Sequence, residues 1–439
     1  MSTIKKLSQD FQVFACLPFI TLAKEKSIHL GPVIFWSASS YREFIPEDRQ
    51  EAFITYINSI GQIKALVDQA GHQLINTLKV SPEELTCISI DIKIAESQKQ
   101  ALLIDALYLL YFACTYRSLY FGNEIPSFNG FRKIIPASID FIEDKANWKT
   151  LFIKENSRED LICIHQPDDH TCLGFATILS EIYHSYSQTE EQIEAPKRFV
   201  RALRYFIDRL FPGFVNLVSK GLEIDEDQNK AEDLIFLGAS LEALLDINQE
   251  QPQADFKYKL RLILHFKFAR PLELFWKWVD EFYETRKKFI HSGYSPDSYF
   301  HANPNFVIPL NFIGIKLFIY AVWQILQTQL PPKEIDLKPL PAEEIFLYFF
   351  TEESLLRKIE RYLELLQEDP SEKELAKDIH NLASLFVKMQ QKNFTQHGIK
   401  FIPTPASEVL ESSKKILTYP IEGALLPENF VELLQRRVA

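Results

Sequence analysis

Residues Pro271–His291 read PLELFWKWVDEFYETRKKFIH, and their spacing predicts a long amphipathic helix. One stripe of this helix holds its apolar positions: Leu272, Phe275, Trp276, Val279, Phe282, Tyr283, Phe289 and Ile290. At about 3.6 residues per turn the next inward position of the stripe is 286, where the residue is Arg286. A guanidinium keeps its charge in proteins, so a buried arginine needs an anionic partner or a water-lined cleft. Arg286 is therefore the first residue for which the sequence demands an explanation.

Further amphipathic helices are predicted on both sides of this one, at Pro196–Phe211, Lys230–Asn248, Asp255–Phe268 and Phe306–Leu330. Together they predict an all-helical domain over residues 191–330. The apolar run Phe306–Leu326 approaches the length of a membrane span, but Pro309, Asn311 and Lys316 interrupt it. We interpret it as a buried core helix and expect no membrane contact.

Residues 1–190 predict an α+β domain of unknown role. Extended segments at Phe11–Leu22 and Leu30–Ser37 are predicted to pair as strands. The other predicted elements are a helix from about Pro46 to Leu78, a strand at Thr86–Ile92, a buried helix at Gln98–Phe121 and strand-like runs within Asn147–Gly174.

After residue 330 the sequence predicts a proline-rich linker over residues 331–344, which holds four prolines, and a helical region over residues 345–439. The expected fold class is thus predominantly α: an α+β N-terminal region, an all-α bundle and a helical C-terminal region.

The composition is that of an ordinary globular protein, with 46% hydrophobic and 24% charged residues. The 48 basic and 59 acidic residues give a net charge of −11, which excludes a protein that binds polyanions through its overall charge. Five scattered cysteines and the absence of an apolar leader in MSTIKKLSQD favour a cytoplasmic location.

Positive charge is nevertheless concentrated beside Arg286. Between Gln251 and Tyr294 there are nine basic and five acidic residues, a local excess of four positive charges. Any site for a polyanion is therefore expected here.

His291 follows Arg286 by five residues and precedes Ser292 and Gly293, which are typical of a helix C-terminus. Positions 286 and 291 are about 140° apart around an ideal helix, so we expect the helix to end or bend at His291. Arginine and histidine can then meet one phosphate, as charge clamp and proton carrier. This pair suits RNA cleavage by the ribose 2′-hydroxyl, which needs neither a metal nor a protein nucleophile.

The segment EFYETRKKFIHSG resembles the Arg-x4–6-His signature of HEPN ribonuclease domains, most closely their Apea-like branch, through Tyr283, Arg286 and His291. The upstream segment FLGASLEALL is similar to the Leu-Glu-Ala-Leu helix of the same branch and supplies Glu242. The resemblance covers residues 190–330.

The resemblance implies a helical domain that forms a homodimer, in which two such segments build one RNA-cleaving cleft. It implies that His291 is the general acid or base, that Arg286 stabilises the phosphorane, and that no cofactor is needed. Supporting or RNA-contacting roles are expected for Glu242, Tyr283, Lys287, Lys288 and Ser292. Family members often serve as toxins or antiviral effectors, so an antitoxin or regulatory protein is a possible partner. Lys287 after the arginine and Ser292 between His291 and Gly293 depart from the family pattern.

Two alternatives remain open from the sequence. In the first, the domain is a non-catalytic scaffold for a nucleotide, a nucleic acid or a protein, with Arg286 paired to Glu242 and Lys287 and Lys288 at a helix C-terminus. In the second, a hairpin places four side chains of the zinc-ligand type on one face. The same residues could equally form an ordinary hairpin surface that binds no metal. These ligands are Cys163, His165, His170 and Cys172.

Overall fold

The computed structural model describes most of the chain. The described residues are 10–22, 27–55, 57–58, 85–121, 135–136, 169–185, 190–210, 226–248, 250–264, 271–292, 299–300, 306–329, 340–346, 349, 352–391, 400–401, 406–419 and 426–439. Helices predominate among them, and an antiparallel sheet lies near the N-terminus. The predicted fold class, predominantly α with an α+β N-terminal region, is confirmed.

The sheet has the strand order β2-β3-β4-β1-β5, and all of its pairs are antiparallel. Its strands are β1 (Phe11–Thr21), β2 (Ser27–Leu30), β3 (Val33–Ser37), β4 (Leu85–Asp91) and β5 (Ile135–Pro136). The strand predicted at Thr86–Ile92 is therefore confirmed, and it becomes the partner of both β1 and β3.

The predicted pairing of Phe11–Leu22 with Leu30–Ser37 is wrong. Leu30 ends β2 and Val33 begins β3, and the two strands form a hairpin around Gly31. Gly31 has a φ of 63°, a conformation that suits glycine and lets the chain reverse within two residues. The hairpin supplies β3 with one neighbour, and β4 lies between β3 and β1.

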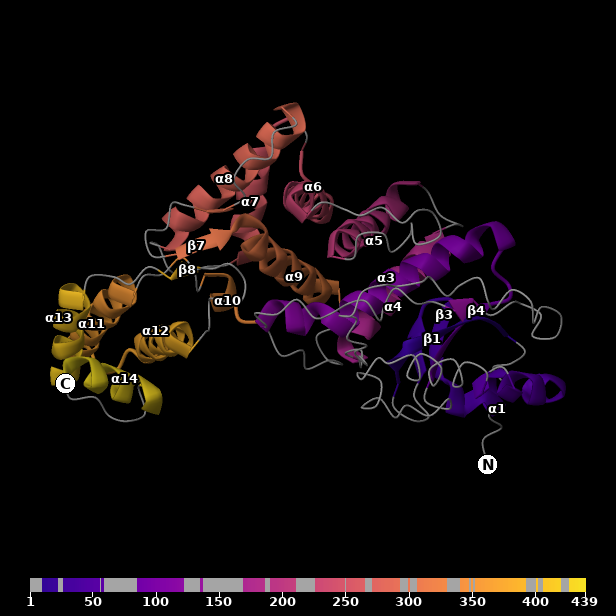
Figure 1. Cartoon of the computed structure of the whole chain (residues 1–439), viewed down its shortest axis with the longest axis horizontal. Helices are drawn as coiled ribbons and strands as arrows, with labels where there is room; N and C mark the ends of the chain where they lie inside the picture. Colours follow the sequence, from indigo (N-terminus) through magenta and orange to yellow (C-terminus); the bar gives the residue numbers. More distant parts are fainter. Residues whose placement is uncertain are drawn as a thin grey trace.

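Side chains alternate between the two faces of the sheet. Val33 and Phe35 of β3 belong to the main core, whereas Ile34 and Trp36 belong to a smaller cluster on the opposite face. Figure 1 shows α3 (Glu96–Phe121) and α4 (Asp169–Ser185) on one side of the sheet and α1 (Tyr41–Phe44) on the other. Both faces are thus covered by helices.

The buried helix predicted at Gln98–Phe121 is confirmed as α3. The helix predicted from Pro46 to Leu78 is described over residues 46–55 and 57–58, of which Glu47–Arg49 form a 3-10 turn and residues 50–55 and 57–58 are α-helical; the rest lies outside the described residues. Residues 147–168 also lie outside them, but residues 169–174 belong to α4 rather than to a strand.

The predicted central helices are confirmed with changed ends. They are α5 (Glu190–Leu210), α6 (Glu226–Leu245), α7 (Pro252–Leu264), α8 (Pro271–Ser292) and α9 (Leu310–Gln329). Helix α5 begins before Pro196, which removes only one backbone hydrogen bond at that position. Residues Phe306–Pro309 form strand β7 instead of helix, because Pro309 favours an extended residue before it and a helix start after it.

Helix α9 lies at the centre of the molecule and contacts α3, α4, α6 and α10 (Glu343–Phe346). Its segment Leu310–Thr328 has the length and apolar content of a membrane span, and 72% of that segment's most apolar window is buried. The interpretation of this run as a core helix is confirmed by that burial.

The C-terminal region is helical, as predicted. Figure 1 shows its helices gathered into one group: α11 (Glu352–Glu368), α12 (Lys373–Gln391), α13 (Ala406–Thr418) and α14 (Glu428–Val438). A small antiparallel sheet of β6 (Tyr299–Phe300), β7 and β8 (Lys400–Phe401) connects this region to the residues that precede α9.

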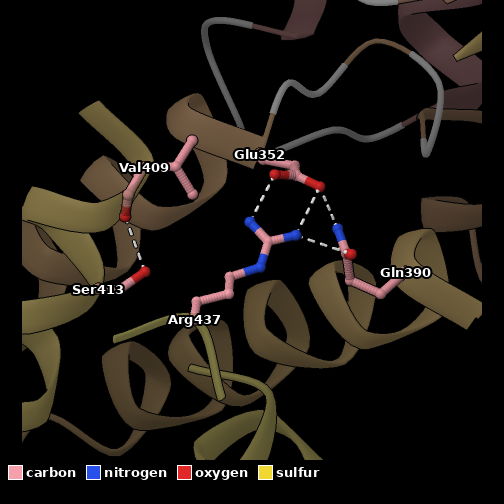
Figure 2. Close-up of polar contacts among 5 residues, drawn as sticks. All are labelled: Glu352, Gln390, Val409, Ser413 and Arg437. Carbon is pink, nitrogen blue, oxygen red and sulfur yellow. Dashed lines mark hydrogen bonds and ion pairs between the residues drawn. The ribbon is translucent and has the colours of Figure 1, made fainter. Parts of the chain in front are cut away.

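Three side chains join the C-terminal helices to one another (Figure 2). Arg437 of α14 donates to both carboxylate oxygens of Glu352 on α11, at 2.7 and 3.0 Å, and at 2.8 Å to Gln390 Oε1 on α12. The Gln390 amide also donates to Glu352. Within helix α13, the Ser413 hydroxyl donates to the Val409 carbonyl at 2.7 Å.

The end of the predicted linker is packed. Leu340, Ile345 and Phe346 are buried in the main core, and the Tyr120 hydroxyl donates to the Pro341 carbonyl at 2.7 Å. Residues 330–339 lie outside the described part. The main cluster of buried side chains has members from Leu22 to Leu434, so it includes residues from the N-terminal, central and C-terminal regions alike.

Candidate functional site

Helix α8 provides most of the candidate site, and its buried stripe sets its orientation. Phe275, Val279 and Phe282 are buried as predicted, and Trp278 joins them instead of Trp276. Position 278 is three residues after Phe275 and four before Phe282, so it belongs to the same helical face. The Trp278 indole donates to the Leu310 carbonyl at 3.3 Å, which satisfies its N–H inside the core.

Arg286 faces inward, as the apolar period predicts. Its side chain is only 16% exposed, and it makes a two-pronged ion pair with Glu242 of α6, which is 13% exposed. One guanidinium nitrogen donates to Glu242 Oε1, and the other donates to Oε2 at 2.9 Å. The pairing with Glu242 is the arrangement that the sequence left open as a structural alternative.

Tyr283 is the third member of this cluster. Its hydroxyl donates to Glu242 Oε1 at 3.2 Å. Burial, reinforced by the Glu242 carboxylate, raises the pKa of Tyr283 far above its usual value. The phenol therefore stays protonated near neutral pH, where it can donate a hydrogen bond but cannot act as a nucleophile or a base.

A hollow of about 770 Å³, open to solvent, lies against this cluster. Six of its lining residues come from α8: Tyr283, Glu284, Arg286, Lys287, Ile290 and His291. Glu242 lines it from α6, and the opposite wall is Gln251–Ala254 and Lys257 at the start of α7. The hollow is thus bounded by three helices that the main core holds in place.

Arg286 and His291 both line this hollow, although they are about 140° apart around the helix axis. His291 is exposed, and α8 ends at Ser292, one residue later. The expected helix end at His291 is confirmed. Of the other supporting candidates, Lys287 lines the hollow and is exposed, Lys288 is exposed, and Ser292 is the last helical residue.

Ion pairs neutralise part of the positive charge that the sequence concentrates here. Lys257 pairs with Asp280, and Lys259 pairs with Asp255 at 3.2 Å. The Arg261 guanidinium lies 5.1 Å from the centroid of the Trp276 ring. Lys267 and Arg270 lie outside the described residues. On the α8 side of the hollow the exposed lining residues that carry a polar group are Glu284, Lys287 and His291.

The predicted hairpin of zinc-type ligands is wrong where the structure describes it. His170 and Cys172 belong to helix α4, where positions two apart point about 200° apart, and Cys172 is buried in the core. The buried residues of α4 are three or four positions apart, as expected for one face of a helix: Cys172, Phe175, Leu179 and Ile182. This helical spacing outweighs the two-residue alternation on which the hairpin prediction was based. Cys163 and His165 lie outside the described residues, among which no cluster of three His, Cys, Asp or Glu side chains fits a metal ion.

Sequence reasoning missed several residues of the site. Ile290, which the sequence placed on the inward apolar stripe, is instead 52% exposed and lines the hollow one turn after Arg286, next to the end of α8. Lys257 and residues 251–254 carried no such signal, because their place opposite α8 depends on how α7 packs. Gly238 of α6, which lies against Arg286, was also missed.

Comparison with protein-family models, with curated proteins and with solved structures finds no match to this chain. The resemblance to HEPN domains therefore rests on the residues of α6 and α8 named above.

Proposed function

We propose that this chain is a metal-independent endoribonuclease of the HEPN type, in which Arg286 and His291 act on one phosphodiester. The observation that carries the proposal is that both side chains line the same open hollow at the end of α8. A guanidinium and an imidazole at one concave surface can supply the charge stabilisation and the proton transfer that metal-independent phosphodiester cleavage uses.

In the proposed reaction the ribose 2′-oxygen attacks phosphorus and the bond from phosphorus to the 5′-oxygen breaks. The products are a 2′,3′-cyclic phosphate and a 5′-hydroxyl, so no water, metal or protein nucleophile is consumed. His291 takes the 2′-hydroxyl proton. The leaving oxygen needs a proton as well, and in a homodimer the imidazole of a second copy supplies it.

Arg286 would stabilise the charge that builds up on the phosphorane. Glu242 engages two of the five guanidinium N–H groups, which leaves donors for a phosphate and fixes the plane of the group. In this proposal Glu242 and Tyr283 orient Arg286, and Lys287 attracts the RNA backbone.

The proposed biological setting follows the resemblance. The substrate is RNA, the working form is a homodimer in the cytoplasm, and the role is that of a defence effector or toxin held in check by an antitoxin or regulatory protein. No cofactor takes part.

The ion pair favours a second candidate function. Glu242 already compensates the shielded charge of Arg286. In this second function the ion pair has a purely structural role, which is to hold α6 against α8. The hollow would then bind a nucleotide, a nucleic acid or a protein without turnover.

An RNA-cleavage assay in the presence of a metal chelator distinguishes the two functions. If the chain is a ribonuclease, the wild type is expected to cleave RNA and leave cyclic-phosphate ends. His291→Ala is expected to lower the cleavage rate by about 10²–10⁴-fold. His380→Ala is the matched control, since His380 is an exposed histidine on α12. Arg286→Ala is expected to abolish cleavage.

The control for Arg286→Ala is Arg437→Ala, which breaks a comparable ion pair (Figure 2) between helices that do not line the hollow. Cleavage that survives in both His291→Ala and Arg286→Ala removes the catalytic assignment. RNA binding without cleavage, weakened by Lys287→Ala, would instead support the scaffold.

A further inference from the structure

Gly238 of α6 lies directly beneath the Arg286 side chain. It is buried, and it precedes Glu242 by four residues on the same face of the helix. A Cβ atom added at Gly238 would lie 2.8 Å from Arg286 Cδ, 2.9 Å from Nε and 3.1 Å from Cζ. The first two distances are too short for real contacts, so the Arg286 side chain approaches the Gly238 backbone this closely because the glycine has no side chain.

The contact with Gly238 also explains why Arg286 Nε makes no hydrogen bond among the described residues. This atom is buried. The space beside it is taken by the Gly238 backbone, so water does not reach it. The hydrogen bonds that orient the guanidinium in the structure are therefore those to Glu242.

Gly238 and Glu242 together form a seat for the guanidinium. The glycine limits movement toward α6, and the carboxylate fixes the direction of the two terminal nitrogens. Glycine inside a helix is disfavoured relative to alanine through its backbone entropy. The helix therefore carries a residue that is locally unfavourable at the one place where Arg286 needs the room.

We propose that Gly238 is a positioning residue for Arg286: its missing side chain sets the height at which the guanidinium meets Glu242 and the hollow. The effect of Gly238 on catalysis rests on the proposed function. The way in which Gly238 and Glu242 hold the guanidinium does not depend on that function.

The first test measures the seat without any activity. The coupling between Arg286 and Glu242 is obtained from the unfolding of Arg286→Ala, Glu242→Ala and the double variant, in the Gly238 chain and again with Gly238→Ala. The coupling is expected in the glycine background and is expected to be mostly lost in the alanine background. Unchanged coupling overturns the proposal.

Gly174→Ala is the matched control. A Cβ at Gly174 of α4 would lie 2.9 Å from Leu326 Cδ2, so it creates a similar overlap with a flexible side chain at another place. This variant is expected to leave the coupling between Arg286 and Glu242 intact. Equal loss of coupling in both glycine variants would mean a general effect of helix crowding and would overturn the specific role.

A second variant keeps the proposal testable if Gly238→Ala alone does not fold. Arg286→Ala removes the three atoms nearest to the new Cβ, so Gly238→Ala combined with Arg286→Ala is expected to fold like Arg286→Ala alone. Failure of the combined variant to fold would show that another contact requires the glycine.

The second test measures the rate of RNA cleavage. Gly238→Ala is expected to lower kcat at least tenfold with KM little changed, because the misplaced group acts on the transition state. Wild-type chain without cleavage, but with coupling that depends on Gly238, would contradict the proposed function and leave the seat supported. Cleavage unchanged by Gly238→Ala would contradict the positioning role.

Discussion

Glu242 accepts hydrogen bonds from two side chains of α8, Tyr283 and Arg286, and this sharing governs what single substitutions do. Glu242→Ala leaves a mostly shielded guanidinium without its anion, and Arg286→Ala leaves the shielded carboxylate. Each is expected to lower the free energy of unfolding by about 3 kcal/mol. The double variant is expected to lose clearly less than the sum, as measured by chemical denaturation.

Arg361 and Glu364 of α11 provide the control for this prediction. Their side chains are 65% and 41% exposed and form an ion pair at 2.9 Å. Because water screens both charges, the same cycle is expected to give a coupling below about 0.5 kcal/mol. Additive losses at Arg286 and Glu242 would show that the inner pair contributes no more than this surface pair.

Tyr283→Phe tests the buried phenol through the pH dependence of stability. The pKa of Tyr283 is raised on folding, so its contribution is fully present below its ordinary value of 10.0 and is lost as the pH rises above it. At pH 7 the variant is expected to be about 1 kcal/mol less stable, the value of one hydrogen bond. Above pH 10 the difference is expected to shrink and then reverse.

Denaturant unfolding at a series of pH values measures this effect, with Tyr258→Phe as the control, since Tyr258 is 59% exposed. A difference between wild type and Tyr283→Phe that stays constant up to pH 11 would contradict the assignment.

At this scale the sequence predicted the inward position of Arg286 and named Glu242 as its possible partner. The first follows from helical periodicity, which is a local property, whereas Glu242 was named through the resemblance of FLGASLEALL to a Leu-Glu-Ala-Leu helix. The hollow opposite α8 was not predictable, because it exists only once the start of α7 lies across from Ile290 and His291.

At the scale of elements, Arg437 attaches the last helix to its neighbours (Figure 2). Glu352, whose side chain is 6% exposed, depends on this arginine of α14 for its charge compensation. Arg437→Ala is expected to destabilise the protein by about 3 kcal/mol. It is also expected to speed amide hydrogen exchange in α14 before the rest of the chain is affected.

Arg436→Ala is the control, because Arg436 is the preceding residue and its side chain is 72% exposed. It is expected to change stability by less than about 0.5 kcal/mol. Equal exchange in α14 of both variants would argue against the role given to Arg437.

Helix positions were predicted well because a helix shows itself in local sequence, as an apolar period in α5 and α8 and as a long apolar run in α3. Strand pairing was predicted poorly, since it depends on partners distant in sequence. Phe11–Thr21 pairs with Leu85–Asp91 rather than with the next strand along the chain. The same limit explains the error at α4, where an apparent two-residue alternation over Cys163–Cys172 crossed the start of a helix.

For the whole molecule, the proposed reaction predicts a dimer. Light scattering is expected to give twice the chain mass of 51.1 kDa. Ile290 is 52% exposed and lines the hollow, so a charge placed there meets its own copy across a two-fold axis at this site. Ile290→Asp is therefore expected to weaken the dimer at least tenfold.

Leu173→Asp is the control, because Leu173 of α4 is 53% exposed and does not line the hollow. It is expected to leave the dimer unchanged. A monomer at all concentrations would rule out a cleft shared by two copies.

The sequence indicated separate N-terminal, central and C-terminal regions from shifts in pattern. It did not indicate that one buried cluster would include side chains from all three. Such continuity arises from contacts such as that of Phe275 with Phe346 and Phe349, which no local pattern encodes.

The central place of α9 has a consequence for synthesis on the ribosome. Helix α3 ends at Phe121, but α9, which covers it, is complete only at Gln329, about 200 residues later. At about 5–20 residues per second, α3 gains its contacts with α9 roughly 10–40 seconds after it is made, although α4 and α5, which also pack on α3, are synthesised earlier. During that interval the face of α3 that α9 later covers is exposed apolar surface, which is prone to aggregation.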